Sequence, residues 1–152
     1  PGFGTSFGRF PVSPALLDIN VLLALAWPNH QHHGFAHEWF AQHARTGWAT
    51  CALTQLGFVR LSANPAYTPY AVSPAEASSL LGHYLAHPQH HFFASPPVVP
   101  GSVFSRALGH RQVNDAWLVA AAIHSGGRLV TFDAGVRAHA LDPNWVEVIQ
   151  TG

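Results

Sequence analysis

The sequence predicts an α/β domain of three layers, α/β/α, with a central, mostly parallel sheet of about four to five strands. Short apolar runs alternate along the chain with longer segments whose apolar residues recur at helical spacing. The apolar runs do not alternate with polar residues, which indicates strands that helices cover on both faces, as in a parallel sheet. With 152 residues, 48% of them hydrophobic, the chain is long enough for one domain with a substantial core.

Each element follows from a local pattern. The clearest strand covers residues 128–132, a run that ends in Asp133. The clearest helix start is Ser73–Glu76, with Ser as N-cap, Pro at the first helical position and Glu in the capping-box position. We expect strands at about residues 14–18, 48–50, 91–94, 128–132 and 145–149. We expect helices at about residues 20–26, 33–45, 53–61, 74–86, 112–125 and 135–140, with a proline-rich connection at 95–100.

The domain limits and the compartment follow from composition. We expect residues 1–13 to be a flexible N-terminal segment or an expression remnant, and residues 14–152 to form a single domain. Cys51 is the only cysteine, so no disulfide forms within the chain and a reducing cytoplasm is the simpler expectation. No apolar run reaches the roughly 18 to 20 residues of a membrane span, and the N-terminus does not resemble a signal peptide. We therefore expect a cytoplasmic protein without a membrane partner.

Three carboxylates fall at junctions between the expected elements. Asp18 and Asp133 directly follow two expected strands, and Asp115 lies in the first turn of the helix at 112–125. Active sites of parallel sheets lie beyond the carboxyl ends of the strands, so neighbouring strands would bring these acids into one crevice. Mg²⁺ or Mn²⁺ takes such oxygen ligands and activates water for phosphodiester hydrolysis. This pattern favours a hydrolytic metal site.

Each acid also has a simpler explanation. An Asp at a helix start commonly caps the helix or interacts with its dipole, and Asp133 with Gly135 fits a turn after a strand. A phosphohydrolase with Asp18 as nucleophile is another alternative. It would need a second Asp at position 20 and a well-placed Lys, but position 20 is Asn and the chain has no Lys.

Four segments together resemble the PIN-domain ribonucleases, and among them the VapC-type toxins of toxin–antitoxin pairs. The first, at 16–22, reads Leu-Leu-Asp-Ile-Asn-Val-Leu, with an Asp two residues before an Asn at the end of the first strand. The others, at 48–61, 114–122 and 129–136, follow in the family's order. Between them the four segments span the chain from about 15 to 149, which makes the resemblance specific.

The resemblance implies a PIN-like fold, endonucleolytic cleavage of RNA with Mg²⁺ or Mn²⁺, a homodimer and neutralisation by a cognate antitoxin protein. It also implies roles for single residues. Asp18, Asp115 and Asp133 would hold the metal, Asn20 would orient a ligand or water, and Thr131 would support Asp133 by hydrogen bonding.

One position departs from the family's pattern. The family usually has a Glu in the helix after the second strand, and Gln55 occupies that place here. Gln can hydrogen-bond a water or a substrate but carries no charge and takes up no proton. Glu38 is a possible substitute, although a solvated helix surface explains it more simply. The alternative function is therefore a catalytically weakened PIN-like module that binds RNA or dimerises.

The remaining polar residues give weaker indications. Only 9% of residues are charged and the formal net charge is zero, so RNA contacts would depend on local groups. Arg106, Arg111, Arg128 and Arg137 flank the third and fourth segments and are candidates for phosphate contacts, with a solvated surface as the simpler explanation. His33 and His37 have the spacing of a helical metal pair but would need two further ligands. We interpret Trp27, Trp39, Trp117, Phe132 and Cys51 as core residues rather than as base-stacking or reactive groups.

Overall fold

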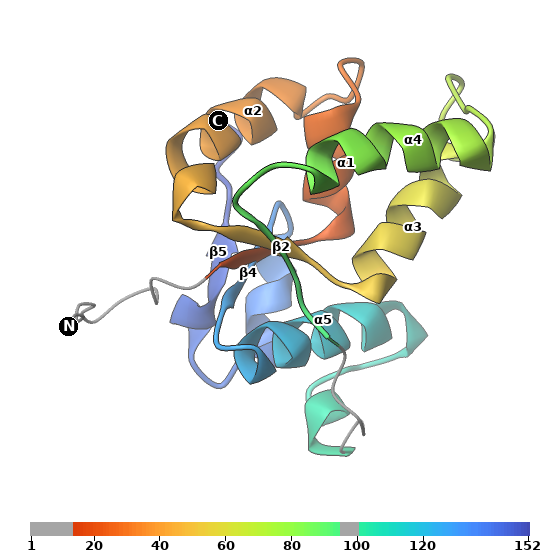
Figure 1. Cartoon of the computed structure of the whole chain (residues 1–152). Coiled ribbons are helices and arrows are strands. Elements are labelled where there is room, and N and C mark those ends of the chain that lie inside the picture. Colours follow the sequence, from red (N-terminus) through yellow and green to blue (C-terminus); the bar gives the residue numbers. More distant parts are fainter. Residues whose placement is uncertain (1–13, 95–100) are drawn as a thin grey trace.

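The computed structural model describes residues 14–94 and 101–152 and shows a five-stranded sheet between two layers of helices (Figure 1). The predicted segment at 1–13 and the proline-rich connection at 95–100 lie outside the described residues. The strands are β1 (Ala15–Leu17), β2 (Trp48–Thr50), β3 (His90–Phe92), β4 (Arg128–Thr131) and β5 (Val146–Val148). The α-helices are α1 (Ile19–Ala26), α2 (His33–His43), α3 (Ala52–Ser62), α4 (Pro74–Leu85) and α5 (Val113–His124). The 3-10 helices are η2 (Ala44–Thr46), η3 (Gly101–Phe104), η4 (His110–Gln112), η5 (Ala134–His139) and η6 (Pro143–Trp145).

All strand pairs in the sheet are parallel, in the order β3-β2-β1-β4-β5. The central strand β1 pairs with β4 through Leu17 and Val130, so the ends of these two strands lie side by side. The three-layer fold and the parallel sheet predicted from the apolar runs are confirmed. The strands that precede Asp18 and Asp133 are neighbours, which is the condition for the two acids to share one crevice. The predicted helix at 135–140 is a 3-10 helix, η5, rather than an α-helix.

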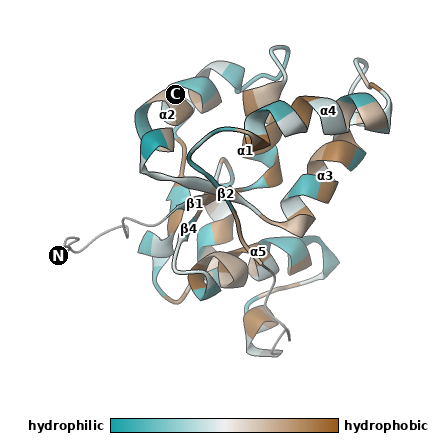
Figure 2. Ribbon diagram, in the orientation of Figure 1, coloured by the Kyte–Doolittle hydropathy of each residue, from teal (hydrophilic) through white to brown (hydrophobic). Residues whose placement is uncertain are grey.

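The two sheet faces pack against separate hydrophobic clusters. Leu17 and Val130 face the cluster formed with α1, α2, α3 and α4, while Leu16 and Leu129 face the cluster formed with α5 and η5. This alternation explains why the strands read as continuous apolar runs, since neighbouring residues enter different cores. Figure 1 shows α5 on the opposite side of the sheet from α1 and α2. Along α2 and α4, hydrophobic and hydrophilic residues alternate in Figure 2, as in helices that bury one face.

Local signals fix the ends of several helices. At α4 the predicted capping box is present: the Ser73 hydroxyl accepts from the Glu76 backbone N–H at 3.1 Å, and the Glu76 carboxylate accepts from the Ser73 N–H at 3.0 Å. At the end of α5, Gly126 has a φ of +77°, a conformation that favours glycine. In the part of the chain that the structure describes, no helix is long and apolar enough to cross a membrane.

Candidate active site

Asp18 lies at the carboxyl end of β1, where the strand turns directly into α1. Only 6% of the residue is exposed, and its carboxylate accepts two hydrogen bonds. Oδ1 accepts from the Ile19 backbone N–H at 2.7 Å, and Oδ2 accepts from the Thr131 hydroxyl at 2.8 Å. The simpler explanation for Asp18, a helix cap, therefore holds, since the side chain caps α1. The same carboxylate also accepts a hydrogen bond from Thr131 at the end of the neighbouring strand β4, and a helix cap does not need this second contact.

Thr131, at the end of β4, connects these groups. Its fully buried hydroxyl donates to Asp18 and accepts from the Asn20 amide nitrogen at 3.3 Å and from the Asp133 backbone N–H at 3.1 Å. The hydroxyl has a single proton, so its donor bond goes to the Asp18 carboxylate. The predicted support of Asp133 by Thr131 is thus limited to the backbone of Asp133. Asn20 also accepts from the Phe132 N–H at 3.4 Å, so its amide braces the end of β4, and a role in orienting a ligand or water stays a prediction.

The three predicted acids lie within electrostatic reach of one another. The pKa of Asp18 is raised from its ordinary value of 3.8 to about 6, chiefly by burial, and the charges of Asp115 and Asp133 add to this effect. The hydrogen bonds from Thr131 and Ile19 oppose it. Burial and the charge of Asp133 also raise the pKa of Asp115. The three carboxylates thus lie near the carboxyl ends of β1 and β4, and their joint role as a metal site stays a prediction.

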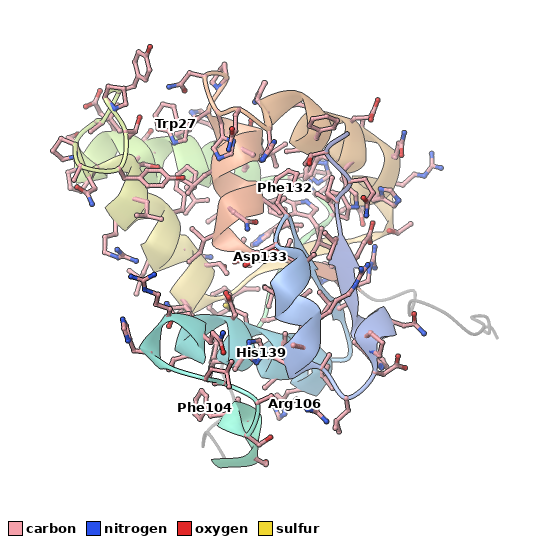
Figure 3. The ribbon with its side chains drawn as sticks, turned by 180° about the vertical axis from the view of Figure 1, so that it is seen from behind. Trp27, Phe104, Arg106, Phe132, Asp133 and His139 are labelled. Atoms are coloured by element: carbon pink, nitrogen blue, oxygen red, sulfur yellow. The ribbon has the colours of Figure 1, made fainter. Side chains whose placement is uncertain are left out.

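Asp133 lies between β4 and η5 and is largely exposed (Figure 3). Its Oδ1 accepts from the Gly135 backbone N–H at 2.9 Å, which is the turn geometry that the sequence also allowed. One carboxylate oxygen is therefore held by the protein, and the other has no hydrogen bond within the described structure. Asp133 thus combines a local turn with a position at the edge of the carboxylate cluster.

The carboxylate oxygens of Asp18, Asp115 and Asp133 are suitable ligands for a hard divalent cation, although they do not by themselves form a complete coordination sphere. Within residues 14–94 and 101–152, no three His, Cys, Asp or Glu side chains converge tightly enough to hold a metal ion by themselves. Mg²⁺ characteristically keeps several waters and binds through one or two carboxylates together with substrate phosphates, so full convergence is not required. A bound cation would also offset the repulsion that neighbouring carboxylates exert on Asp18 and on Asp115.

Gln55 is anchored at the carboxyl end of β2. Its amide nitrogen donates to the Thr50 hydroxyl at 2.9 Å, and this hydroxyl lies 2.8 Å from Nε2 of His90. Burial, with smaller contributions from His91 and His87, lowers the pKa of His90, which favours the neutral ring.

Glu38, the possible substitute for the missing acid, is exposed on α2. It is not among the carboxylates whose charge raises the pKa of Asp18. The structure therefore gives no support to Glu38 as a substitute and favours the solvated helix surface.

His139, on η5, is a site residue that the sequence analysis missed. Its charge lowers the pKa of Asp115, which places it beside the carboxylate cluster. Among the described side chains its Nδ1 is buried without a hydrogen-bond partner. Figure 3 shows His139 between Asp133 and Phe104. No local signal marks it, because it is one of 12 histidines and η5 folds back over α5 only in the tertiary structure.

The four arginines considered as phosphate ligands lie in different places. Arg128 is a wrong candidate: it is at the start of β4, at the opposite edge of the sheet, and its Nε forms an ion pair with Glu147 at 2.9 Å. Arg106 donates to the Ala140 carbonyl at 3.5 Å and Arg137 to the Val146 carbonyl at 3.4 Å. Arg111 is exposed on η4, close to the start of α5. Arg106 lies on the side of the molecule that carries Asp133 and His139 (Figure 3).

The histidine pair does not extend to a metal site. The rings of His33 and His37 are 4.4 Å apart, but His33 Nδ1 is hydrogen-bonded to the Ala24 carbonyl at 2.8 Å. No third ligand joins them within the described part of the chain.

Most of the residues interpreted as core occupy it. Cys51 and Trp39 are buried. Phe132 packs partly against the core and lies 4.9 Å from the His32 ring. Trp27 and Trp117 are only half-buried, and each contributes to the wall of a surface hollow.

The chain belongs to the PIN-domain family, whose profile matches residues 15–141. It is 48% identical to Ribonuclease VapC38 of Mycobacterium tuberculosis over 122 residues, which cover 80% of this chain and 86% of that relative. It is 43% identical to Ribonuclease VapC39 of the same organism over 138 residues, 89% of this chain and 99% of the relative. Ribonuclease VapC44 is 42% identical over 131 residues, 84% of this chain and 91% of its own length. The resemblance read from the four sequence segments is confirmed.

Proposed function

We propose that this protein is a metal-dependent endoribonuclease that acts as the toxin of a VapC-type toxin–antitoxin pair. The observation that carries the proposal is the position of Asp18 and Asp133 at the carboxyl ends of the paired strands β1 and β4, with Asp115 close enough for its charge to raise the pKa of Asp18. Relatives at 42% to 48% identity bear the name ribonuclease, which supports hydrolysis of RNA.

Asp18, Asp115 and Asp133 would hold Mg²⁺ or Mn²⁺, in part through water. When bound, this cation would supply a lowered pKa for the attacking water and offset the charge that develops on the phosphate. With a pKa of about 6, Asp18 is ionised at neutral pH and remains available as a ligand. The bonds from Thr131 and Ile19 fix its orientation before any substrate arrives.

The other site residues would act by positioning. Thr131 and Asn20 hold the ends of β1 and β4 together, and so keep Asp18 and Asp133 in register. Gln55 would present its amide oxygen to a water or to the RNA, because its nitrogen is held by Thr50. This uncharged group makes the site less anionic than a Glu would, so cation binding would depend more on the RNA phosphate.

The partners are proposed on the same basis. The relationship to the VapC proteins supports a cognate antitoxin protein as partner. We also propose a homodimer. Leu56, Leu108 and Leu141 are 69%, 91% and 88% exposed, and large exposed apolar side chains are typical of protein-binding surfaces when they cluster. We propose that such partners cover one or more of these side chains.

The test is RNA cleavage by the purified protein. Transfer RNA, ribosomal RNA and an unstructured RNA are incubated with Mg²⁺, Mn²⁺ or chelator, and Asp115→Asn is compared with the exposed control Asp142→Asn. We expect discrete fragments that require the metal, are lost in Asp115→Asn and persist in Asp142→Asn. RNA binding without cleavage by the wild-type protein would instead support the catalytically weakened binding module.

A further inference from the structure

Two hydrogen bonds connect the edge strand β3 to Gln55. Nε2 of His90 lies 2.8 Å from the Thr50 hydroxyl, and the Gln55 amide nitrogen donates to the same hydroxyl at 2.9 Å. Thr50 ends β2 and is fully buried, and Gln55 lies near the start of α3, which follows β2 closely (Figure 1). One buried hydroxyl is therefore shared by a histidine and an amide from two different elements.

The ring of His90 is held in one orientation. It lies against the buried ring of Trp48, with 4.7 Å between the centroids. It also hydrogen-bonds the backbone of Leu85, and this bond raises the pKa of His90, as a donation from the ring to a carbonyl does. Nε2 already faces Thr50, so the bond to Leu85 belongs to Nδ1. The neutral ring thus carries its proton on Nδ1 and accepts at Nε2.

The Thr50 hydroxyl has one proton, whose direction depends on the charge of His90. Beside the neutral ring, the hydroxyl donates to Nε2 and accepts from the Gln55 amide nitrogen, which satisfies both observed contacts. Beside the protonated ring, Nε2 donates to the hydroxyl oxygen, so the hydroxyl proton needs another acceptor. Among the described residues the other partner of this hydroxyl is Gln55. Its amide oxygen can accept the proton once the amide has turned over.

Gln55 lies at the same edge of the sheet as the proposed cation site. β1 and β2 are parallel neighbours, and their register places Thr50 one residue before the level of Asp18. A methyl group on Gly57 would meet the side chain of Ile19, so the first half of α3 packs against the residue that follows Asp18. A turn of the half-buried Gln55 amide therefore changes the polar groups at this edge.

We propose that His90 is a positioning residue that sets, through Thr50, which end of the Gln55 amide faces the cation site. A neutral His90 leaves the amide oxygen available to accept from a cation-bound water. A protonated His90 presents the amide nitrogen, which accepts nothing, so cation binding weakens. The effect on the cation rests on the proposed function, whereas the turn of the amide does not.

Few groups act on the charge of His90. Burial lowers its pKa from the ordinary value of 6.5, and the neighbouring His91 and His87 lower it further. Among the described residues, the other elements that pack against the ring contribute no charge, but only Trp48 and Thr50 of β2 and the Leu85 backbone of α4. The protonation that turns the amide therefore occurs at mildly acidic pH.

The turn of the amide is measured without RNA or metal. Isotope-labelled protein is titrated by NMR in chelator from about pH 4.5 to about pH 8. The side-chain amide signals of Gln55, identified by their loss in Gln55→Leu, are followed together with the ring signals of His90. We expect the amide signals to shift with the same midpoint as the ring. His83→Gln, at an exposed histidine of α4, is the matched control and should leave this titration unchanged.

Two variants distinguish the proposed role from a merely structural one. In His90→Phe the Thr50 hydroxyl has no ring nitrogen to donate to, so it donates to the Gln55 amide oxygen at every pH. The amide signals should then stop titrating and lie near the acidic end of the wild-type series. Gln55→Leu removes the acceptor that the protonated state needs, so the His90 midpoint should move to lower pH. This second variant keeps the test valid if His90→Phe fails to fold.

The effect on the cation is measured at about pH 7.5, where Asp18, with a pKa of about 6, is ionised in every protein compared. The Mn²⁺ concentration that gives half-maximal thermal stabilisation should rise about threefold to tenfold in His90→Phe, which corresponds to the loss of one hydrogen bond. His83→Gln should keep the wild-type value.

Three results would overturn the inference. The first is a set of Gln55 amide signals that do not follow His90, or that still titrate in His90→Phe. The second is a His90 midpoint that does not fall in Gln55→Leu. The third is a His90→Phe protein that binds Mn²⁺ as tightly as the wild type. If the wild type neither binds Mn²⁺ nor cleaves RNA, the proposed function fails, and the NMR titrations alone decide whether His90 turns the amide.

Discussion

Replacing Asp18 by Asn is expected to stabilise the metal-free protein at neutral pH while it abolishes cleavage. Burial raises the pKa of Asp18 to about 6, against an ordinary value of 3.8, so the folded state disfavours the ionised carboxylate. The stabilisation that protonation gives is fully present below pH 3.8 and is lost as pH rises through about 6. Asn carries no charge at any pH and so keeps the folded state free of this penalty.

The difference between 3.8 and about 6 corresponds to about 3 kcal/mol at 1.36 kcal/mol per pKa unit. Part of it is offset, because an Asn amide nitrogen facing Thr131 cannot accept the hydroxyl proton that Asp18 Oδ2 accepts. The loss of that hydrogen bond costs about 1 kcal/mol. We therefore expect Asp18→Asn to raise the free energy of unfolding by about 2 kcal/mol at pH 7.5, and by less than about 1 kcal/mol at pH 5.

Urea unfolding in chelator at the two pH values measures this difference. Asp142→Asn is the matched control: Asp142 is exposed and caps η6 by accepting from the Asn144 N–H at 2.9 Å, a role that Asn fills equally well. It should change stability little at either pH. The reasoning is refuted if Asp18→Asn is less stable than the wild type at pH 7.5, or if its advantage grows as pH falls.

The remaining predictions concern the surroundings of the site. Thr131→Val removes the buried donor to Asp18, so it should destabilise the protein by about 1 to 3 kcal/mol and move the acidic limb of the cleavage pH profile to higher pH. Gly57→Ala would place a methyl group against the Ile19 side chain. We expect it to lower the free energy of unfolding by about 1 to 3 kcal/mol, measured by thermal unfolding, and Ile19→Ala to restore part of this loss. Gln55→Glu should lower the Mn²⁺ concentration that gives half-maximal thermal stabilisation, and an unchanged midpoint would contradict a place for residue 55 in the site.

The positions of Asp18 and Asp133 could be predicted because each ends an apolar run that is buried on both faces. Such runs indicate parallel strands, and the carboxyl ends of parallel strands share one edge of the sheet. The order of the strands was not encoded locally, and the pairing of β1 with β4 became known only from the structure. The sequence also could not show which carboxylate receives the hydroxyl proton of Thr131. In the structure the hydroxyl donates to Asp18 rather than to the carboxylate of Asp133.

The residues that sequence reasoning missed or misplaced depend on tertiary contacts. His139 approaches Asp115 because η5 packs on α5, and no periodicity marks such a contact. Arg128 is adjacent in sequence to the fourth segment, but its position at the start of β4 puts it at the far edge. Adjacency in sequence misleads in a strand, because its two ends lie at opposite edges of the sheet.

Binding of Mn²⁺ followed by thermal unfolding tests the central claim most directly, namely that Asp18, Asp115 and Asp133 form one cation site. Unfolding midpoints are measured at pH 7.5 over a series of Mn²⁺ concentrations for the wild type and for the Asn variant of each acid, with Asp142→Asn as control. We predict a saturable rise in midpoint for the wild type and the control, and a much weaker rise in all three site variants. An equal rise in the wild type and in every site variant would contradict the account.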